Sequence, residues 1–116
     1  MNPLRSLILA AAGNETIRGL VATAPLTRAV VRRFVAGRSA ADAVEATRGL
    51  VGAGLRVTLD HLGEDVTDAD QAADTVHAYE TLLAALADAG LTTDAEISVK
   101  LSAVGQKLDE GLALAN

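Results

Sequence analysis

The stretches LRVTLDHLGE (residues 55–64) and EISVKLSA (residues 96–103) decide the fold that this sequence predicts. Each is a short, strand-like run with polar residues able to take part in chemistry toward its end. A long segment with helical spacing of its apolar residues, about 68–88, lies between them. A strand–helix–strand order with a connection of this length predicts parallel pairing through a right-handed crossover. The sequence therefore predicts an α/β protein whose functional residues lie where the strands end.

The chain before the first strand, residues 1–53, is predicted to be entirely helical. Pro3 suits the first turn of a helix, Thr27 is a candidate N-cap, and Ser39 with Asp42 forms a candidate capping box. The helices are predicted at about residues 3–12, 15–22, 27–37 and 39–52.

Beyond the first strand, Thr67 is predicted to cap the helix at 68–88. The second strand is predicted over residues 95–101, and an amphipathic segment follows from Gln106. Two parallel strands do not make a stable sheet alone, because both faces and both edges need cover. We therefore expect the front portion of a longer protein; a barrel of eight strand–helix units takes about 250 residues.

Composition narrows the function classes. Half of the 116 residues are hydrophobic, and the sequence has one Phe, one Tyr, no Trp and no Cys. So few aromatic rings argue against a stacking platform for nucleic acid, and the lack of cysteine excludes disulfides and thiolate metal sites. The formal charge is −5, with the arginines gathered in the first half and most acids in the second. No apolar run approaches the roughly 18 residues of a membrane span, and we expect a cytoplasmic protein.

Lys100 is the strongest candidate for a functional residue. An ammonium group at the end of a buried strand is costly unless it meets an anion. That anion is either a ligand carboxylate or phosphate, or the carboxylate of Asp60 on the adjacent strand, and the two pairings can coexist. Adjacent strand residues point to opposite faces, so only one of Asp60 and His61 faces the site. We favour Asp60 at the site and His61 in packing.

Several other polar residues have weaker claims. Ser102 lies two residues beyond Lys100, so on a continuing strand it shares the same face, where it donates either to a ligand or to a loop amide. Glu64 is expected to cap the loop after the first strand. His77 is expected to be exposed or packed in mid-helix, and no metal-ligand spacing surrounds it. Neither strand is followed by a glycine-rich phosphate loop.

The chain resembles the N-terminal part of bacterial, single-function proline dehydrogenases. The strand motifs TLDHLGE (58–64) and ISVKLSA (97–103) carry most of this resemblance, and LVATAP (20–25) and VRRFV (31–35) add weaker support. The resemblance implies N-terminal helices over 1–53. It implies that residues 54–116 form the first two β/α units of a distorted (β/α)8 TIM-type barrel, incomplete in this chain.

The same resemblance implies the chemistry. The family binds FAD and oxidises L-proline to 1-pyrroline-5-carboxylate, the first step of proline breakdown to glutamate. Electrons then pass to a quinone, which implies peripheral contact with the inner face of the membrane. Lys100 matches the family lysine that holds the substrate carboxylate, with Asp60 and Ser102 as supporting candidates. Catalytic and FAD-binding residues are expected beyond Asn116, so this chain alone is expected to be inactive; no metal or nucleic acid is expected.

Two other classes stay open at this point. One is a different flavin-dependent TIM-barrel oxidoreductase, such as a folate-linked flavin reductase. Whether proline or a nicotinamide reduces the flavin distinguishes such a reductase from a proline dehydrogenase. The other is a non-enzymatic helical interaction module, which the four leading helices favour.

Overall fold

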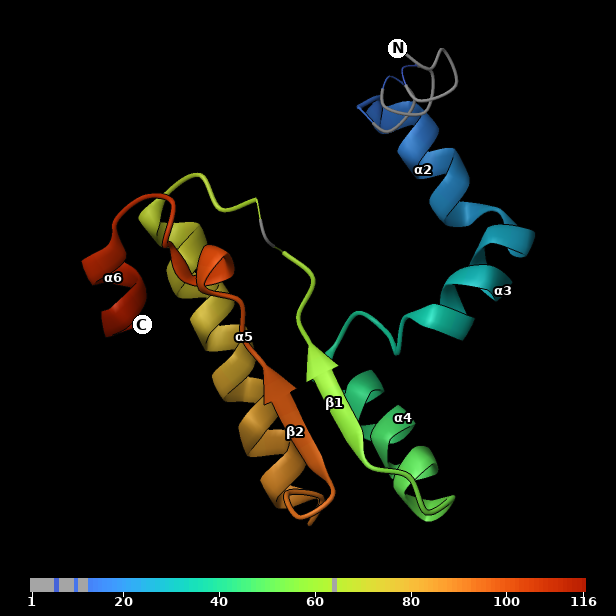
Figure 1. Ribbon diagram of the computed structural model, residues 1–116. Coiled ribbons are helices and arrows are strands. Elements are labelled where there is room, and N and C mark those ends of the chain that lie inside the picture. The colour runs from blue at the N-terminus through green and yellow to red at the C-terminus, as the bar shows by residue number, and fades with distance from the viewer. Residues whose placement is uncertain (1–5, 7–9, 11–12, 64) are drawn as a thin grey trace. The chain divides into compact units, whose positions relative to one another are not determined.

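The computed structural model describes residues 6, 10, 13–63 and 65–116. The chain forms two compact units, Met1–Ala36 and Gly37–Asn116 (Figure 1). The helix predicted at about residues 3–12 lies largely outside the described residues. Among the described helices, none combines the length and apolar character that crossing a membrane requires.

The first unit contains helices α2 (Glu15–Thr23) and α3 (Pro25–Phe34). The Asn14 side chain caps α2 by accepting hydrogen bonds from the backbone N–H groups of the second and third residues after it. The N-cap predicted at Thr27 is wrong, because α3 begins two residues earlier, at Pro25. Proline has no N–H to leave unpaired and its fixed φ angle suits the first helical position.

The second unit opens with helix α4 (Ala40–Gly52), which begins with the capping box that the sequence predicts. The Asp42 N–H donates to Ser39 Oγ at 3.2 Å, and the Ser39 N–H donates to Asp42 Oδ2 at 3.1 Å. The Arg38 N–H donates to the same carboxylate oxygen at 3.1 Å. Hydrogen bonding by the Ser39 side chain, and then by the Arg38 and Ser39 amides, lowers the pKa of Asp42.

Strands β1 (Val57–Asp60) and β2 (Ala95–Ser98) pair in parallel, as predicted, with Asp60 opposite Ser98. The second strand is shorter than the predicted 95–101. The chain instead turns into the 3-10 helix η1 (Leu101–Val104), whose last two residues are buried and which contacts α5. Burial of these apolar side chains therefore outweighs continued strand pairing, and the prediction that Ser102 continues the strand is wrong.

Helix α5 (Ala69–Asp88) connects the strands. Its N-cap is Asp68, whose side chain accepts from the Gln71 N–H at 2.9 Å. The cap predicted at Thr67 is wrong, since Thr67 instead donates its N–H and hydroxyl to the Gln71 side chain. At the other end, Gly90 adopts a φ of 70°, and the Leu91 N–H reaches back to the Leu86 carbonyl. This left-handed glycine turn ends α5 where predicted.

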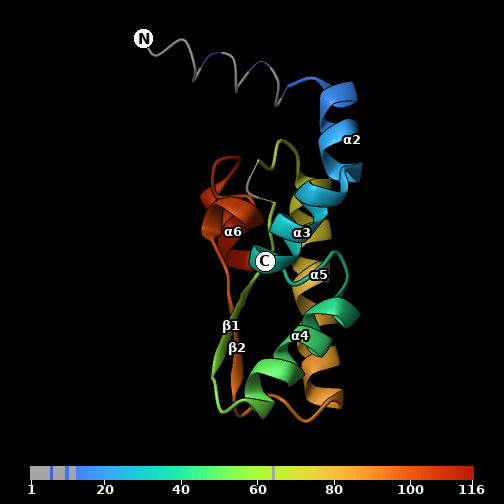
Figure 2. The same cartoon turned by 90° about the vertical axis from the view of Figure 1, so that its right-hand side faces the viewer.

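The core of this unit lies between the helices and one face of the sheet. Leu82, Leu86 and Leu91 form its buried cluster, and residues of α4 and both strands pack against it. Figure 2 shows α4 and α5 on the same side of the two strands. The opposite face of the sheet is exposed and polar; it carries Thr58, Asp60, Glu96 and Ser98. The chain ends with the short helix α6 (Glu110–Ala115), which begins later than the predicted segment.

The α/β class is therefore confirmed, with two parallel strands in the described residues. Closure of a TIM-type barrel and the domain border predicted between residues 53 and 54 stay predictions. Helix α4 belongs to the same compact unit as the strands, because it packs against both β1 and α5.

Candidate functional site

The carboxyl ends of the two strands bring the main candidates together. Asp60 is the last residue of β1, and Lys100 follows β2 by two residues. Lys100 Nζ lies 3.3 Å from Asp60 Oδ2, so the predicted ion pair is present. The side chains are 46% and 33% exposed, respectively. An ion pair this exposed contributes about 0–1 kcal/mol to stability. It also leaves the ammonium group within reach of a ligand anion.

A buried tyrosine, which the sequence did not indicate as a functional residue, forms hydrogen bonds at this edge of the sheet. Tyr79 of α5 is 5% exposed. Its hydroxyl lies 3.1 Å from Asp60 Oδ1 and 2.9 Å from the Ser98 carbonyl, both acceptors, and accepts the His61 N–H at 3.1 Å. Burial raises the pKa of Tyr79, so the hydroxyl stays protonated at neutral pH and keeps a proton to donate. One side chain thus bonds the ends of both strands.

The packing role predicted for His61 is met only by a ring contact, because the residue is exposed. Its ring meets the Tyr79 ring edge-on, with centroids 5.8 Å apart and an interplanar angle of 63°. Asp60, by contrast, directs one carboxylate oxygen at Lys100 and the other at Tyr79. The geometry separates the two neighbours into a packing residue and a charged residue at the edge. A substrate role for Asp60 stays a prediction.

The remaining candidates do not join this group by any described contact. Ser102 is half-buried in η1, and its supporting role stays a prediction. Glu64 lies outside the described residues. His77 is 82% exposed on α5, with Nδ1 3.8 Å from Glu80 Oε2. The described part of the chain contains no group of three or more His, Cys, Asp or Glu side chains arranged to hold a metal ion.

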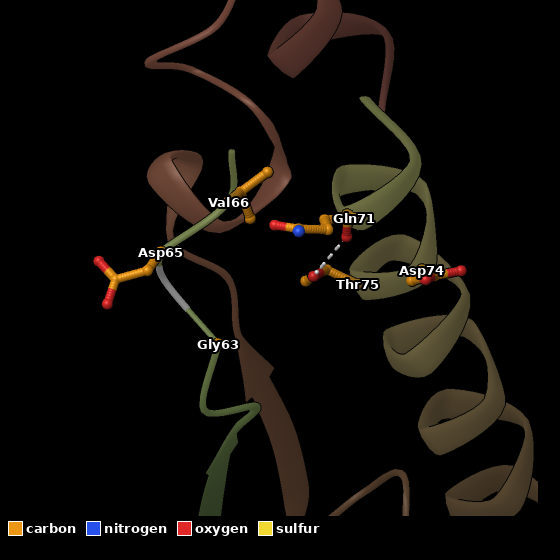
Figure 3. Close-up of a pocket in the computed structure, with 6 residues that line it drawn as sticks. All are labelled: Gly63, Asp65, Val66, Gln71, Asp74 and Thr75. Atoms are coloured by element: carbon orange, nitrogen blue, oxygen red, sulfur yellow. Dashed lines mark hydrogen bonds between the residues drawn. The ribbon is translucent and has the colours of Figure 1, made fainter. Parts of the chain in front are cut away.

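A pocket of about 430 Å³ lies beside the β1–α5 connection (Figure 3). Two of its lining residues, Asp65 and Asp74, carry carboxylates that point away from each other in this view, and the Thr75 hydroxyl donates to the Gln71 carbonyl at 3.0 Å. The other lining residues are Gly63 and Val66, so the residues that line this pocket offer an anion no basic side chain. The edge formed by Asp60 and Lys100 is therefore the better candidate for binding a carboxylate.

Comparison with known proteins shows which proteins this chain is similar to. Over 111 residues, 96% of the chain, it is 36% identical to "Proline dehydrogenase 1" of Bacillus subtilis subsp. natto. The chain is similar to proline dehydrogenases. A second protein of that name, from Bacillus subtilis strain 168, is 35% identical over the same length. The resemblance predicted from the strand motifs is thereby confirmed.

The similarity covers only part of these relatives. The chain spans 36% of the length of each Bacillus proline dehydrogenase. No family model matches the chain, and no solved structure matches it.

Proposed function

We propose that this chain belongs to an FAD-dependent proline dehydrogenase, in which Lys100 binds the carboxylate of L-proline. The observation that carries the proposal is the ammonium group of Lys100, paired with Asp60 at the carboxyl edge of two parallel strands. The proposal is supported by the similarity to proteins named proline dehydrogenase over 96% of the chain. In β/α barrels, this edge of the sheet is where active sites lie.

Lys100 and Asp60 have different roles in the proposed binding of the proline carboxylate. The partly exposed ammonium of Lys100 forms a charge-assisted hydrogen bond to the substrate carboxylate, a contact worth about 1.5–3 kcal/mol. Asp60 holds the amine at the strand edge before substrate arrives. The proline carboxylate then shares Lys100 with Asp60. A ring held at its carboxylate loses rotational freedom, which places its reacting carbon reproducibly.

The reaction converts the ring C–N single bond of L-proline to the C=N bond of 1-pyrroline-5-carboxylate. Two electrons and two protons leave the substrate, so an electron acceptor is required. FAD, when bound, would supply that acceptor. A quinone at the inner face of the membrane would receive the electrons from this cytoplasmic enzyme.

The described residues supply no cradle for the flavin. Neither strand is followed by a glycine-rich phosphate loop, and Tyr79, the one tyrosine of the sequence, is buried. We therefore assign none of these residues to FAD and place its contacts, and the catalytic groups, outside them.

The direct test is anaerobic reduction of the flavin in the purified product of the complete gene. L-Proline is expected to bleach the visible absorbance of the oxidised flavin and to yield 1-pyrroline-5-carboxylate in equal amount. NADH serves as the matched control and is expected to leave the spectrum unchanged. Bleaching by NADH and not by proline would contradict the proposal and favour a flavin reductase.

A further inference from the structure

We infer that Tyr79 is a positioning residue, whose hydroxyl holds Asp60 so that its second carboxylate oxygen faces Lys100. The meaning of this arrangement for proline binding rests on the proposed function. The arrangement itself rests on geometry alone. Tyr79 Oη lies 3.1 Å from Asp60 Oδ1, and Lys100 Nζ lies 3.3 Å from Asp60 Oδ2.

The two carboxylate oxygens have different partners, and this fixes the rotation of the Asp60 side chain. A carboxylate with one partner rotates freely about its last torsion, which is broad and roughly two-fold. A second bond, from a side chain that is 95% buried, removes that freedom. The helix that carries Tyr79 is anchored in the core through Leu82 and Leu86. The position of Lys100 is therefore coupled to a rigid element behind the sheet.

The hydroxyl of Tyr79 also ties the two strand ends together. It has one proton and two acceptors within reach, Asp60 Oδ1 and the Ser98 carbonyl, and its oxygen accepts the His61 N–H. The proton is shared between a carboxylate on β1 and a carbonyl on β2. The simple alternative is that this network only stabilises the sheet and does nothing for Lys100.

Competitive acylation of lysines separates the two roles without any enzyme assay. An amine held in an ion pair is less available to an acylating reagent than a solvated one, and Lys100 Nζ lies 3.3 Å from Asp60 Oδ2. Lys107 is the other lysine of the chain and is exposed, so the labelling ratio of Lys100 to Lys107, read by mass spectrometry, has an internal reference.

The variants are Tyr79→Phe, Asp60→Asn and the double substitution, made in the complete gene product. We expect Asp60→Asn and Tyr79→Phe each to raise the labelling ratio roughly threefold. The double variant is expected to match Asp60→Asn, since Tyr79 acts through Asp60. Thr75→Val, which removes another buried hydroxyl from α5, is the matched control and is expected to leave the ratio unchanged.

Tyr79→Phe keeps the ring and its contact with His61. A second variant, with 4-fluorophenylalanine at position 79, fills the space of the hydroxyl but donates no proton and is expected to give the same ratio as Tyr79→Phe. The inference would be overturned if the labelling ratio of Lys100 to Lys107 stayed unchanged in both folded position-79 variants. An unchanged ratio in Asp60→Asn would overturn it as well.

The kinetic consequence is tested with L-proline and L-prolinamide, whose carboxamide cannot pair with an ammonium. Tyr79→Phe is expected to raise KM for proline roughly fivefold with little change in kcat, and to lower the preference for proline over prolinamide by a similar factor. A purely structural role would change both substrates equally, which would contradict the inference. Failure of the unsubstituted protein to oxidise proline would refute the proposed function, while the labelling ratios would still decide the role of Tyr79.

Discussion

At the scale of single residues, the buried hydroxyl of Thr47 is expected to lower the stability of the fold. It is completely buried in α4, and its Oγ1 has no hydrogen-bond partner in the described part of the chain. Burying a polar group without a partner opposes folding. Thr75, also buried, differs because its hydroxyl donates to the Gln71 carbonyl.

We predict that Thr47→Val stabilises the protein by about 1 kcal/mol, because valine keeps the branched shape and removes the unsatisfied group. The measurement is the free energy of unfolding from denaturant titration. Thr75→Val is the control and is expected to be neutral or destabilising, since it removes a made hydrogen bond. A loss of stability in Thr47→Val would show that its hydroxyl has a partner in solution.

The pairing of Asp60 with Lys100 could be predicted from the sequence, whereas the role of Tyr79 could not. Two polar residues at the ends of neighbouring parallel strands must lie at one edge of the sheet. Tyr79 lies on the apolar stripe of α5, and its ring accounts for its position there. Whether its hydroxyl reaches the strand ends depends on the position of the helix along the sheet, which no spacing in the sequence reveals. The available signal was one hydroxyl-bearing ring in the middle of a stripe of Ala, Val and Leu side chains.

At the scale of elements, the start of α4 depends on a charged group. Hydrogen bonding by the Ser39 side chain, and then by the Arg38 and Ser39 amides, lowers the pKa of the Asp42 carboxyl below the ordinary value of 3.8. A carboxyl group with a lowered folded-state pKa stabilises the fold above its unfolded pKa. That contribution is lost as pH falls through the folded pKa.

Asp42→Ala is therefore expected to lower Tm by a few degrees at neutral pH, through loss of the cap. The difference in Tm between Asp42→Ala and the unsubstituted protein should shrink as pH falls below about 3.8, because the Asp42 carboxylate of the unsubstituted protein then becomes protonated. Thermal melting followed by circular dichroism across this pH range measures both. Asp42→Asn, which does not titrate, is the control. A difference that stays constant down to the lowest pH would rule out the carboxylate as its source.

Element types were easier to predict than element ends. The parallel strands, the crossover helix and the capping box follow from local patterns. The end of β2 does not, because Ala103 and Val104 leave the strand direction to become buried, and their partner, α5, is distant in sequence. The N-cap of α5 is one residue later than predicted because two candidates, Thr67 and Asp68, are adjacent. The start of α3 is earlier than predicted because its N-cap residue, Ala24, has no capping side chain and Pro25 occupies the first helical position.

At the scale of the whole molecule, the sheet has one face for the core and one for a site. Leu59 and Ile97 pack toward the helices, while Thr58 and Glu96 lie on the other face, joined by a 3.1 Å hydrogen bond between their side chains. In a β/α barrel the face away from the helices is the interior. In the proposed barrel this polar face would line the interior, with Asp60 and Lys100 at its edge, as the proposed binding of a small charged substrate requires. The α/β class could be predicted from the order of elements, but barrel closure depends on strands that the described residues do not contain.

The most direct test of the central claim is the KM for L-proline of the complete gene product carrying Lys100→Ala, beside Lys107→Ala as the matched control. Loss of a charge-assisted bond to the substrate carboxylate predicts a rise in KM of roughly tenfold or more for Lys100→Ala. The control is predicted to leave KM unchanged, since Lys107 is exposed and belongs to the segment between η1 and α6, outside both strands. An unchanged KM in Lys100→Ala, or an equal rise in both variants, would contradict the account.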